Sequence, residues 1–305
     1  MSRPLEIAPF VQAALRDHRP LVALETTVVT HGLPAPQGLE LAAELEAAVI
    51  RGGAVPATIG VLDGRVTVGM SRDEIARLAH APDVSKVNLS NLGAVVAGGT
   101  PGSTTVAATL FVAATCGIEV LATGGIGGVH RGAAETGDVS ADLTAFERYG
   151  VAVVCAGAKA ILDLPRTVEA LETAGVPVLG LRTDEFPAFY RRSSGLPVDR
   201  RFDSVDAVAR AIRAHWELGA SGGVLVANPI PEEDEMPAAT YESALEGAFA
   251  DAAEARVTGR ALTPFLLERM RERTGGASVT ANLALLRHNA RVATALAVEL
   301  ARLRS

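Results

Sequence analysis

Short apolar runs alternate along this chain with longer stretches in which apolar side chains recur every three or four residues. The short runs predict buried strands at residues 21–29, 57–62, 84–89, 119–123, 151–155, 176–181 and 223–227. Helical spacing covers residues 39–50, 103–115, 204–218, 238–255, 264–273 and 278–303. Strands that alternate with helices favour a mostly parallel sheet covered on both faces, so the expected fold class is a three-layer α/β/α domain.

A turn signal adds one antiparallel element to this expected sheet. Asp63-Gly64 separates the run 57–62 from a second apolar run at 65–69, which predicts a hairpin and makes the sheet mixed. Residues 31–38 are expected to form a loop, because they are rich in proline and glycine. No internal repeat or linker composition is visible, and we expect residues 1–305 to form a single domain.

Composition and charge exclude several classes of protein. The 305 residues are 49% hydrophobic and carry a net charge of −7 without a basic stripe, so no nucleic-acid-binding groove is expected. No run reaches the roughly 18 apolar residues of a membrane span, and the N-terminal segment lacks the apolar core of a signal peptide. The two cysteines, Cys116 and Cys155, have no metal-type spacing and suit a reducing compartment. We therefore expect a cytoplasmic protein, for which a nucleotide-sized substrate stays possible.

Lysine is rare in this chain, and its placement is informative. Arginine supplies 26 of the 28 basic side chains, and Lys86 and Lys159 are the only lysines. Lys159 follows the apolar run 151–155, where loss of hydration favours a neutral amine that can attack a carbonyl carbon. Arginine supplies charge but cannot act as a nucleophile at neutral pH. The alternative is a lysine whose stem lies on apolar surface while its charge reaches solvent.

Four glycines follow the run 119–123, namely Gly124, Gly125, Gly127 and Gly128. They do not form a dinucleotide-binding fingerprint, because His130 stands where that pattern requires its last glycine. Two interpretations stay open. The glycines form a tight turn that needs positive φ, or their bare amides approach the oxygen atoms of a ligand.

Acidic residues suggest two further sites. Asp138 and Asp142 lie four residues apart around Ser140. In a helical turn both carboxylates would share one side and could hold a hard divalent ion completed by water. The alternative is a helix start with Ser140 as N-cap. Glu25 lies within an apolar run; it either faces a polar cavity, where burial would raise its pKa and suit acid–base catalysis, or it has a structural role such as pairing with an arginine.

Two more polar residues are candidates for ligand contacts. Lys86 lies on a short predicted strand and is followed by asparagine and serine, so it could hold a phosphate group as a point charge. A solvated lysine is the alternative. Asn282 lies within an apolar helix, where a lone asparagine is usually a satisfied core amide.

Long motifs carry a resemblance to a known family. They are ALETTVVTHGLPAPQG, SKVNLSNL, GSTTVAATL, ATGGIGGVHRGAAETGDVSADL, VVCAGAKAILDLPRTVEALETAGVPVLGLRTDEFPAFY, GGVLVANPIPEE, TPFLLERM and TGGASVTANLALLRHNA. Together these motifs resemble the pseudouridine-5′-phosphate glycosidases, a family also called indigoidine synthase A-like. The resemblance extends from about residue 21 to residue 303.

The resemblance implies a role for each matching position. Lys159 matches the Schiff-base lysine of the family, Glu25 its proton donor and Asp138 its manganese-binding aspartate. The remaining positions are expected to contact the substrate, and they are Lys86, Val106, Thr123, His130, Ser140, Ala141, Asp142 and Asn282. Related proteins are trimers with an α/β/α core, so the resemblance also implies a homotrimer with one Mn²⁺ per subunit.

The implied reaction is the reversible cleavage of pseudouridine 5′-phosphate to uracil and ribose 5-phosphate. The bond that breaks joins ribose C1′ to uracil C5. A leaving carbon lacks the lone pair that ordinary glycosidases protonate on a leaving oxygen. The resemblance therefore implies that the ring-opened sugar is held as an iminium on Lys159 while Glu25 delivers a proton to C5.

Two other functions stay open from the sequence. Another imine-forming lyase, such as a sugar-phosphate aldolase, would use the same lysine and the same phosphate contacts. A non-catalytic nucleotide-binding helper in pigment biosynthesis would bind a ligand without turnover. The chain also departs from the family pattern, because His288 stands where related chains usually have asparagine and the segment 191–203 is rich in arginine. These departures concern substrate recognition rather than the lysine chemistry.

Overall fold

The computed structural model describes residues 4–33, 36–259 and 262–304. Its strands are β1 (Leu5–Ile7), β2 (Leu21–Leu24), β3 (Val55–Leu62), β4 (Arg65–Val68), β5 (Ser85–Val87), β6 (Gly102–Thr104), β7 (Val120–Ala122), β8 (Ala152–Cys155), β9 (Val178–Leu181), β10 (Arg200–Phe202) and β11 (Val224–Ala227). Its α-helices are α1 (Pro9–Arg16), α2 (Gln37–Arg51), α3 (Arg72–His80), α4 (Leu92–Ala97), α5 (Val106–Cys116), α6 (Ala133–Thr136), α7 (Ala141–Arg148), α8 (Leu164–Thr173), α9 (Val205–Glu217), α10 (Ala238–Glu254), α11 (Leu262–Arg273) and α12 (Ala277–Arg302). A π-helix, η1 (Val28–Gly32), and a 3₁₀ helix, η2 (Glu232–Asp234), occur between them.

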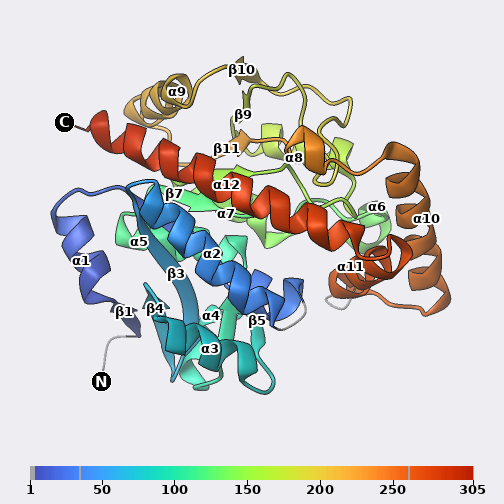
Figure 1. The fold of residues 1–305 in the computed structure, drawn as a ribbon, viewed down its shortest axis with the longest axis horizontal. Coiled ribbons are helices and arrows are strands. Elements are labelled where there is room, and N and C mark those ends of the chain that lie inside the picture. The colour runs from blue at the N-terminus through green and yellow to red at the C-terminus, as the bar shows by residue number, and fades with distance from the viewer. Residues whose placement is uncertain (1–3, 34–35, 260–261, 305) are drawn as a thin grey trace.

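The strands of the described residues form one mixed sheet. Its order is β1-β4-β3-β2-β7-β8-β11-β9-β10, and β6 joins β5 to β3. The pairs β3·β4 and β3·β6 are antiparallel, and the other strand pairs are parallel. Helices α2 and α12 lie side by side across one face, and α5 and α7 pack together behind the sheet (Figure 1). The three-layer α/β/α fold class is confirmed.

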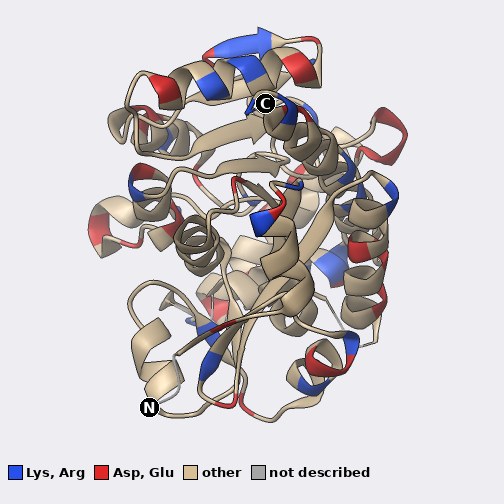
Figure 2. Ribbon diagram, turned by 90° about the vertical axis from the view of Figure 1, so that its left-hand side faces the viewer, with Lys and Arg blue, Asp and Glu red and all other residues tan. Residues whose placement is uncertain are grey.

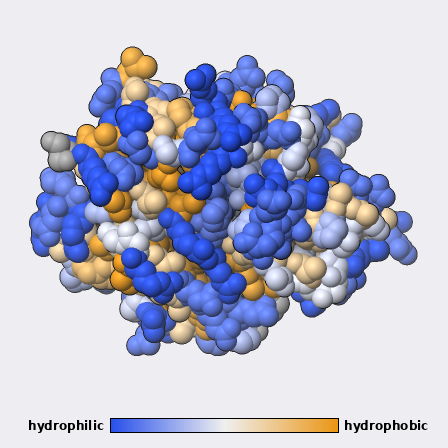
Figure 3. All heavy atoms as spheres, turned by 45° about the horizontal axis from the view of Figure 1, so that its top comes forward, coloured by the Kyte–Doolittle hydropathy of each residue, from blue (hydrophilic) through white to orange (hydrophobic). Residues whose placement is uncertain are grey.

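The hydrophobic core lies between the sheet and its two helix layers. Every residue of β2, β8, β9 and β11 is buried, which is why these strands are unbroken apolar runs in the sequence. Charged residues lie mainly on the helices and loops around the sheet (Figure 2). On the face shown in Figure 3 hydrophilic side chains predominate, with hydrophobic atoms in groups between them. None of the helices in the described residues is both long and apolar enough to cross a membrane.

Several boundaries differ from the prediction. The hairpin of β3 and β4 is confirmed, and its turn residues Asp63 and Gly64 both have positive φ. The predicted strand 21–29 ends at Leu24, because the chain then curls into η1. The predicted helix 103–115 begins only after Thr105, because the residues before it pair with β3 and β5 as strand β6. Residues 34 and 35 of the predicted loop 31–38 lie outside the described residues.

Gly157 is required where the loop after β8 meets the loop after β9. Its φ is +78°, and a Cβ built on it would lie 2.0 Å from the carbonyl oxygen of Pro187. Gly175 has a similar φ of +67°, but nothing lies within 4 Å of its Cβ position. Alanine substitutions at the two positions can therefore be compared. The loss of stability at Gly175 reflects the left-handed backbone alone, and the loss at Gly157 reflects that backbone and a clash.

The variant Gly157→Ala should lose about 3 kcal/mol of unfolding free energy, because a clash with backbone adds to the left-handed strain. Gly175→Ala should lose only about 1 kcal/mol, which is the strain alone. Chemical denaturation of both variants measures the difference. Equal losses would show that the loop at Pro187 moves away without cost.

Candidate active site

The candidate site lies at the carboxyl ends of three neighbouring parallel strands. Glu25 directly follows β2, Thr123 directly follows β7, and Lys159 lies in the loop after β8. Parallel strands bring their carboxyl ends to one edge of a sheet, and ligands bind in the crevice outside that edge. Residues far apart in the sequence therefore meet here.

Backbone hydrogen bonds carry the pairing of β7 and β8 past the ends of both strands. The N–H of Ala156 donates to the Gly124 carbonyl (2.9 Å), and the N–H of Ile126 donates to the Gly157 carbonyl (3.0 Å). The N–H of Lys159 then donates to the Ile126 carbonyl (3.0 Å). These bonds fix the backbone of the lysine beside the glycine-rich segment.

One pocket brings together five of the expected catalytic and substrate-contact residues. These are Glu25, Lys86, Thr123, Lys159 and Asn282. Lys86 comes from β5, in the antiparallel part of the sheet, and Asn282 comes from α12. The pocket is also lined by Thr27, Val28, His31, Gly32, Gly124, Gly125, Phe189, Thr263, Pro264, Leu267 and Leu286. Amine, carboxyl and amide groups thus converge on one space.

Glu25 is placed to carry a proton. Burial raises the pKa of Glu25, while the charge of Lys159, a hydrogen bond from Thr123 and the charge of Lys86 oppose that rise. The hydroxyl of Thr123 donates to Oε1 of Glu25. The direction of the pKa shift favours the protonated carboxyl and fits a general acid. The sequence-based expectation of a polar cavity around Glu25 is confirmed, and no arginine pairs with it within the described residues.

Lys86 shares the electrostatic environment of the pocket. Burial lowers the pKa of Lys86, the charge of Lys159 lowers it further, and Asp142 and Glu25 oppose the shift. The backbone of Lys86 pairs with Ser103 in β6, and its carbonyl accepts a hydrogen bond from Asn91 (3.0 Å). The side chain of Lys86 is partly buried and lines the pocket, which favours the ligand-contact interpretation over a fully solvated lysine.

Asp142 holds backbone amides and is buried. Its Oδ1 accepts from the N–H of Ala107 in α5 (2.8 Å), and its Oδ2 accepts from the N–H of Gly127 (2.7 Å). Helix α7 begins at Ala141, and Ser140 caps it by accepting from the N–H of Asp142 (3.2 Å). The helix-start interpretation is confirmed. The prediction that Asp138 and Asp142 share one helix face is wrong, because Asp138 lies before the N-cap of α7 and outside the helix.

His130 and Asp138 are neighbours in the fold. The N–H of His130 donates to the Asp138 carbonyl (3.1 Å). Burial lowers the pKa of His130; the charge of Asp138 opposes this, and the charges of Lys159 and Lys86 add to it. These interactions favour a neutral imidazole, which can both accept and donate a hydrogen bond.

Few side chains in the described residues are placed to bind a metal ion. Within residues 4–33, 36–259 and 262–304, no three His, Cys, Asp or Glu side chains are close enough together to hold an ion. The carboxylate of Asp138 has no hydrogen-bond partner among these residues, whereas both oxygens of Asp142 serve backbone amides. One free carboxylate fits only an ion that completes its shell with water and substrate oxygens, as Mg²⁺ often does.

The glycine-rich segment is explained by close packing. None of its four glycines has positive φ, so the tight-turn interpretation is wrong. A Cβ on Gly127 would lie 2.2 Å from Oγ of Ser140, and one on Gly128 would lie 2.4 Å from Thr167. The N–H groups of Gly127 and Ile126 also bind protein oxygens rather than pointing to a ligand. Side chains from neighbouring elements require these glycines.

The other expected contact residues are not among those that line the pocket. Val106 and Ala141 are the first residues of α5 and α7, whose starts Asp142 joins. Asp142 still acts on the charges of Glu25 and Lys86. The substrate contacts of Val106, His130, Ser140, Ala141 and Asp142 stay predictions.

His31 and Phe189 line the pocket although the sequence analysis did not single them out. Nδ1 of His31 lies 2.6 Å from Oγ1 of Thr30, which lies 2.6 Å from Oγ of Ser103. Burial and the charge of Lys86 lower the pKa of His31. Both residues occur within the motifs that carry the family resemblance, but nothing in their spacing marks them as site residues.

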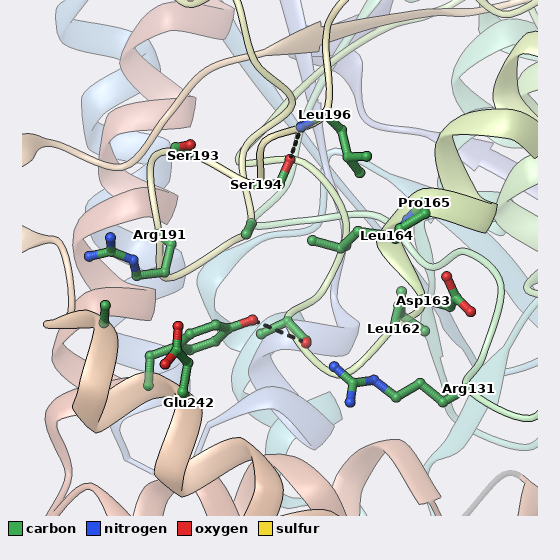
Figure 4. Close-up of a pocket in the computed structure, with 14 residues that line it drawn as sticks. Arg131, Leu162, Asp163, Leu164, Pro165, Arg191, Ser193, Ser194, Leu196 and Glu242 are labelled. Atoms are coloured by element: carbon green, nitrogen blue, oxygen red, sulfur yellow. Dashed lines mark hydrogen bonds between the residues drawn. The ribbon is translucent and has the colours of Figure 1, made fainter.

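A second cavity, of about 590 Å³, is lined by residues that follow Lys159 in the chain, among them Leu162 and Asp163 (Figure 4). It is lined by Ala160, and α10 forms its opposite wall. The hydroxyl of Tyr241 donates to the Ala160 carbonyl (3.4 Å) across it. Arg191 in its wall is already paired with Glu235 (2.9 Å). The described lining of this cavity contains none of the predicted site residues.

Comparisons with known proteins agree with the geometry. The family described as indigoidine synthase A like protein matches residues 10–299. A relative from Caldanaerobacter subterraneus subsp. tengcongensis, named pseudouridine-5′-phosphate glycosidase, is 49% identical and aligns over 99% of both chains. A relative of the same name from Methylobacterium nodulans is 52% identical over 99% of this chain and 89% of its own length.

Two solved structures share the fold. The prealnumycin C-glycosynthase in complex with ribulose 5-phosphate has a TM-score of 0.92 and 39% sequence identity, and covers 100% of this chain and 99% of its own. An indigoidine synthase A-like protein from Thermotoga maritima has a TM-score of 0.89 and 38% identity, with coverages of 98% and 97%. The likeness therefore extends over the whole sheet and its helices.

The raised pKa of Glu25 predicts a pH-dependent stability. The stabilisation from the neutral carboxyl is fully present below the pKa of an unfolded glutamate and is lost as pH rises through the raised pKa of the folded protein. Between about pH 5 and pH 8, the unfolding free energy of the wild type should therefore fall more than that of Glu25→Gln. Chemical denaturation at both pH values measures this difference.

The matched control is Glu169→Gln, which changes an exposed carboxyl on α8. It should keep the pH dependence of the wild type. Identical pH dependence in the wild type and in Glu25→Gln would contradict the raised pKa of Glu25.

Proposed function

The chain belongs to the indigoidine synthase A-like family, and on this premise we propose that it reversibly cleaves pseudouridine 5′-phosphate to uracil and ribose 5-phosphate. The observation that carries the proposal is the meeting of Lys159 with Glu25 and Lys86 in one pocket. That pocket combines an amine, a carboxyl that favours its protonated form and a second cation. These are the groups that cleavage of a carbon–carbon bond in a sugar phosphate requires.

In the first step of the proposed reaction, the amine of Lys159 replaces the ring oxygen O4′ on C1′ of the ribose. Opening of the ribose breaks the C1′–O4′ bond as Nζ of Lys159 bonds to C1′, and the proton that the amine loses is taken up by O4′, which becomes a hydroxyl. The nitrogen lone pair then forms a C=N bond as the C1′–C5 bond breaks, and the electrons of that bond take a proton at C5. Uracil leaves, and water hydrolyses the iminium to release ribose 5-phosphate and the free amine. The Schiff base is part of the proposal.

Glu25 is proposed to deliver the proton to C5. Burial raises its pKa, which favours the protonated form that an acid needs before bond cleavage. The Thr123 hydroxyl donates to Oε1 and holds the carboxyl in one orientation. In the reverse direction the carboxylate would accept the proton from C5 of uracil.

The phosphate group is proposed to bind at Lys86. The charge of this lysine lies in the pocket. Asp142 draws the starts of α5 and α7 together, and helix starts favour anions. Val106, Ser140 and Ala141 at these starts, and Asp142 itself, would lie along the sugar phosphate. Thr123, His130 and Asn282 are proposed to contact the sugar and the base.

Asp138 is proposed to hold a divalent ion, in line with the Mn²⁺ that the family resemblance implies. Its carboxylate has no other hydrogen-bond partner within the described residues. A bound ion would supply ordered water and positive charge near the substrate. The residues of this chain perform the bond cleavage described above, and the homotrimer and the cytoplasmic location stay predictions.

Lys159→Arg should retain the fold and lose uracil release by roughly three orders of magnitude or more, because arginine keeps the charge but not the nucleophile. Borohydride added with ribose 5-phosphate should attach a pentitol phosphate to Lys159 in the wild type. Mass spectrometry of peptides locates the adduct, and a uracil assay with pseudouridine 5′-phosphate and Mn²⁺ measures turnover.

The matched control is Lys86→Arg, which makes the same change at the other lysine. It should keep the adduct on Lys159 and raise the KM for the sugar phosphate. Triose release in place of uracil release would favour an aldolase. Ligand binding without turnover or adduct would favour a non-catalytic helper.

Asp138→Asn should weaken Mn²⁺ binding by about tenfold or more, because a neutral amide replaces the one protein carboxylate available to the ion. Titration calorimetry measures the affinity independently of turnover. Glu135→Gln, at an exposed acid three residues earlier, should bind Mn²⁺ as the wild type does. An unchanged affinity in Asp138→Asn would place the ion elsewhere.

A further inference from the structure

Phe189 has a backbone conformation that bulky residues rarely adopt. Its φ is +63°, in the left-handed region. In the described chain the other non-glycine residues with positive φ are all exposed and polar, namely His18, Asp63, Asp83, Arg182 and Arg256. Phe189 is instead buried. Such strain persists only where surrounding contacts impose it, and it is concentrated at functional sites.

The contacts that impose this conformation come from the loop of the reactive lysine. The N–H of Phe189 donates to the carbonyl of Ala156 (3.0 Å), and the neighbouring Ala188 pairs with Gly157. These partners lie two and three residues before Lys159. The backbone of Phe189 is therefore hydrogen-bonded to the same loop that carries Lys159.

The ring of Phe189 lies against bare backbone at Gly125. A Cβ on Gly125 would lie 2.5 Å and 2.7 Å from two carbon atoms of the ring. A Cβ on Gly124 would lie 3.3 Å from Leu286 and 3.4 Å from Oδ1 of Asn282. One end of the pocket is therefore apolar, formed by Phe189 and the backbone of Gly124 and Gly125, and Asn282 supplies an amide side chain there.

This apolar end is next to the proposed proton donor. Gly124 directly follows Thr123, whose hydroxyl donates to Glu25. The group that receives the proton must lie beside Glu25, and in the proposed reaction that group is the pyrimidine base. A pyrimidine has a flat π face that suits an aromatic or apolar wall, and polar edges that suit an amide.

We propose that Phe189 is the wall against which the planar base of the substrate packs, and that its ring sets the affinity for the base. This inference rests on the proposed function. It assigns the base to the end of the pocket formed by Gly124, Gly125 and Phe189, with Asn282 at its polar edge. The sugar phosphate then extends toward Lys86.

The loop offers a matched control in Phe186. This residue is also a fully buried phenylalanine, and it lies 3.1 Å from the Cβ position of Gly157. It is absent from the described lining of the pocket. A phenylalanine that only supports the loop should behave as Phe186 does.

The test uses synthesis from uracil and ribose 5-phosphate. Phe189→Leu should raise the KM for uracil about fivefold or more, while the KM for ribose 5-phosphate and the borohydride adduct on Lys159 stay within about twofold. Phe186→Leu should lower the Tm as well but leave the KM for uracil unchanged. Equal changes in both variants would overturn the inference.

A second measurement uses the unmodified protein and does not depend on the variants folding. The compound 5,6-dihydrouracil keeps the amide edge of uracil but has a puckered ring. It should inhibit cleavage about fivefold more weakly than uracil does. Equal inhibition would count against packing on a flat ring. A wild type that releases no uracil and traps no sugar would instead refute the proposed function.

Discussion

The site depends on backbone hydrogen bonds that continue the pairing of two central strands beyond their ends. Beyond strands β7 and β8 the backbone forms loops, yet the two loop segments stay paired. Residues 124–126 hydrogen-bond to residues 156–159. A loop held in this way has little conformational freedom, so the backbone of Lys159 keeps one position relative to Thr123, which follows the neighbouring strand β7. In the reaction proposed for Lys159, such placement lowers the entropy that must be lost when the amine reacts. The sheet therefore positions the chemistry, rather than only supporting it.

Buried polar groups reinforce this arrangement. Nδ2 of Asn289, a buried residue of α12, donates to the Thr123 carbonyl (2.8 Å) and the Gly124 carbonyl (3.3 Å). Its Oδ1 accepts from Nδ2 of Asn228, which follows β11 (2.8 Å). Asp142 binds the Gly127 amide from the opposite layer. Unpaired polar groups are costly in the interior, so these partners fix the glycine-rich segment from both faces of the sheet.

Much of the fold followed from local patterns in the sequence. The parallel strands were visible because burial on both faces makes them unbroken apolar runs, and helices such as α9 were visible from periodicity. The end of β2 at Leu24 was not visible, because Val28 and Val29 continue the apolar run although the chain turns into η1. Strand β6 was missed for a similar reason, because its three residues precede a helix without a break in composition.

The site was only partly predictable for a different reason. Lys159 stood out because lysine is rare, and Glu25 stood out because a carboxyl in an apolar run is costly. The roles of the glycines could not be read, because they depend on side chains of distant elements such as Ser140, Thr167 and Phe189. The hydrogen bonds of Asp142 could not be predicted either, because its partners in α5 and the glycine-rich segment are distant in the sequence.

The position of α12 in the chain has a consequence for biosynthesis. This helix is the last element of the structure, and it supplies both Asn282 in the pocket and Asn289 beneath it. During translation the strands that bear Glu25 and Lys159 leave the ribosome well before these amides do. Nascent chains and products of premature termination upstream of α12 would therefore carry the amine without a finished pocket around it. The pocket described here is complete only when α12 has docked between α2 and α9.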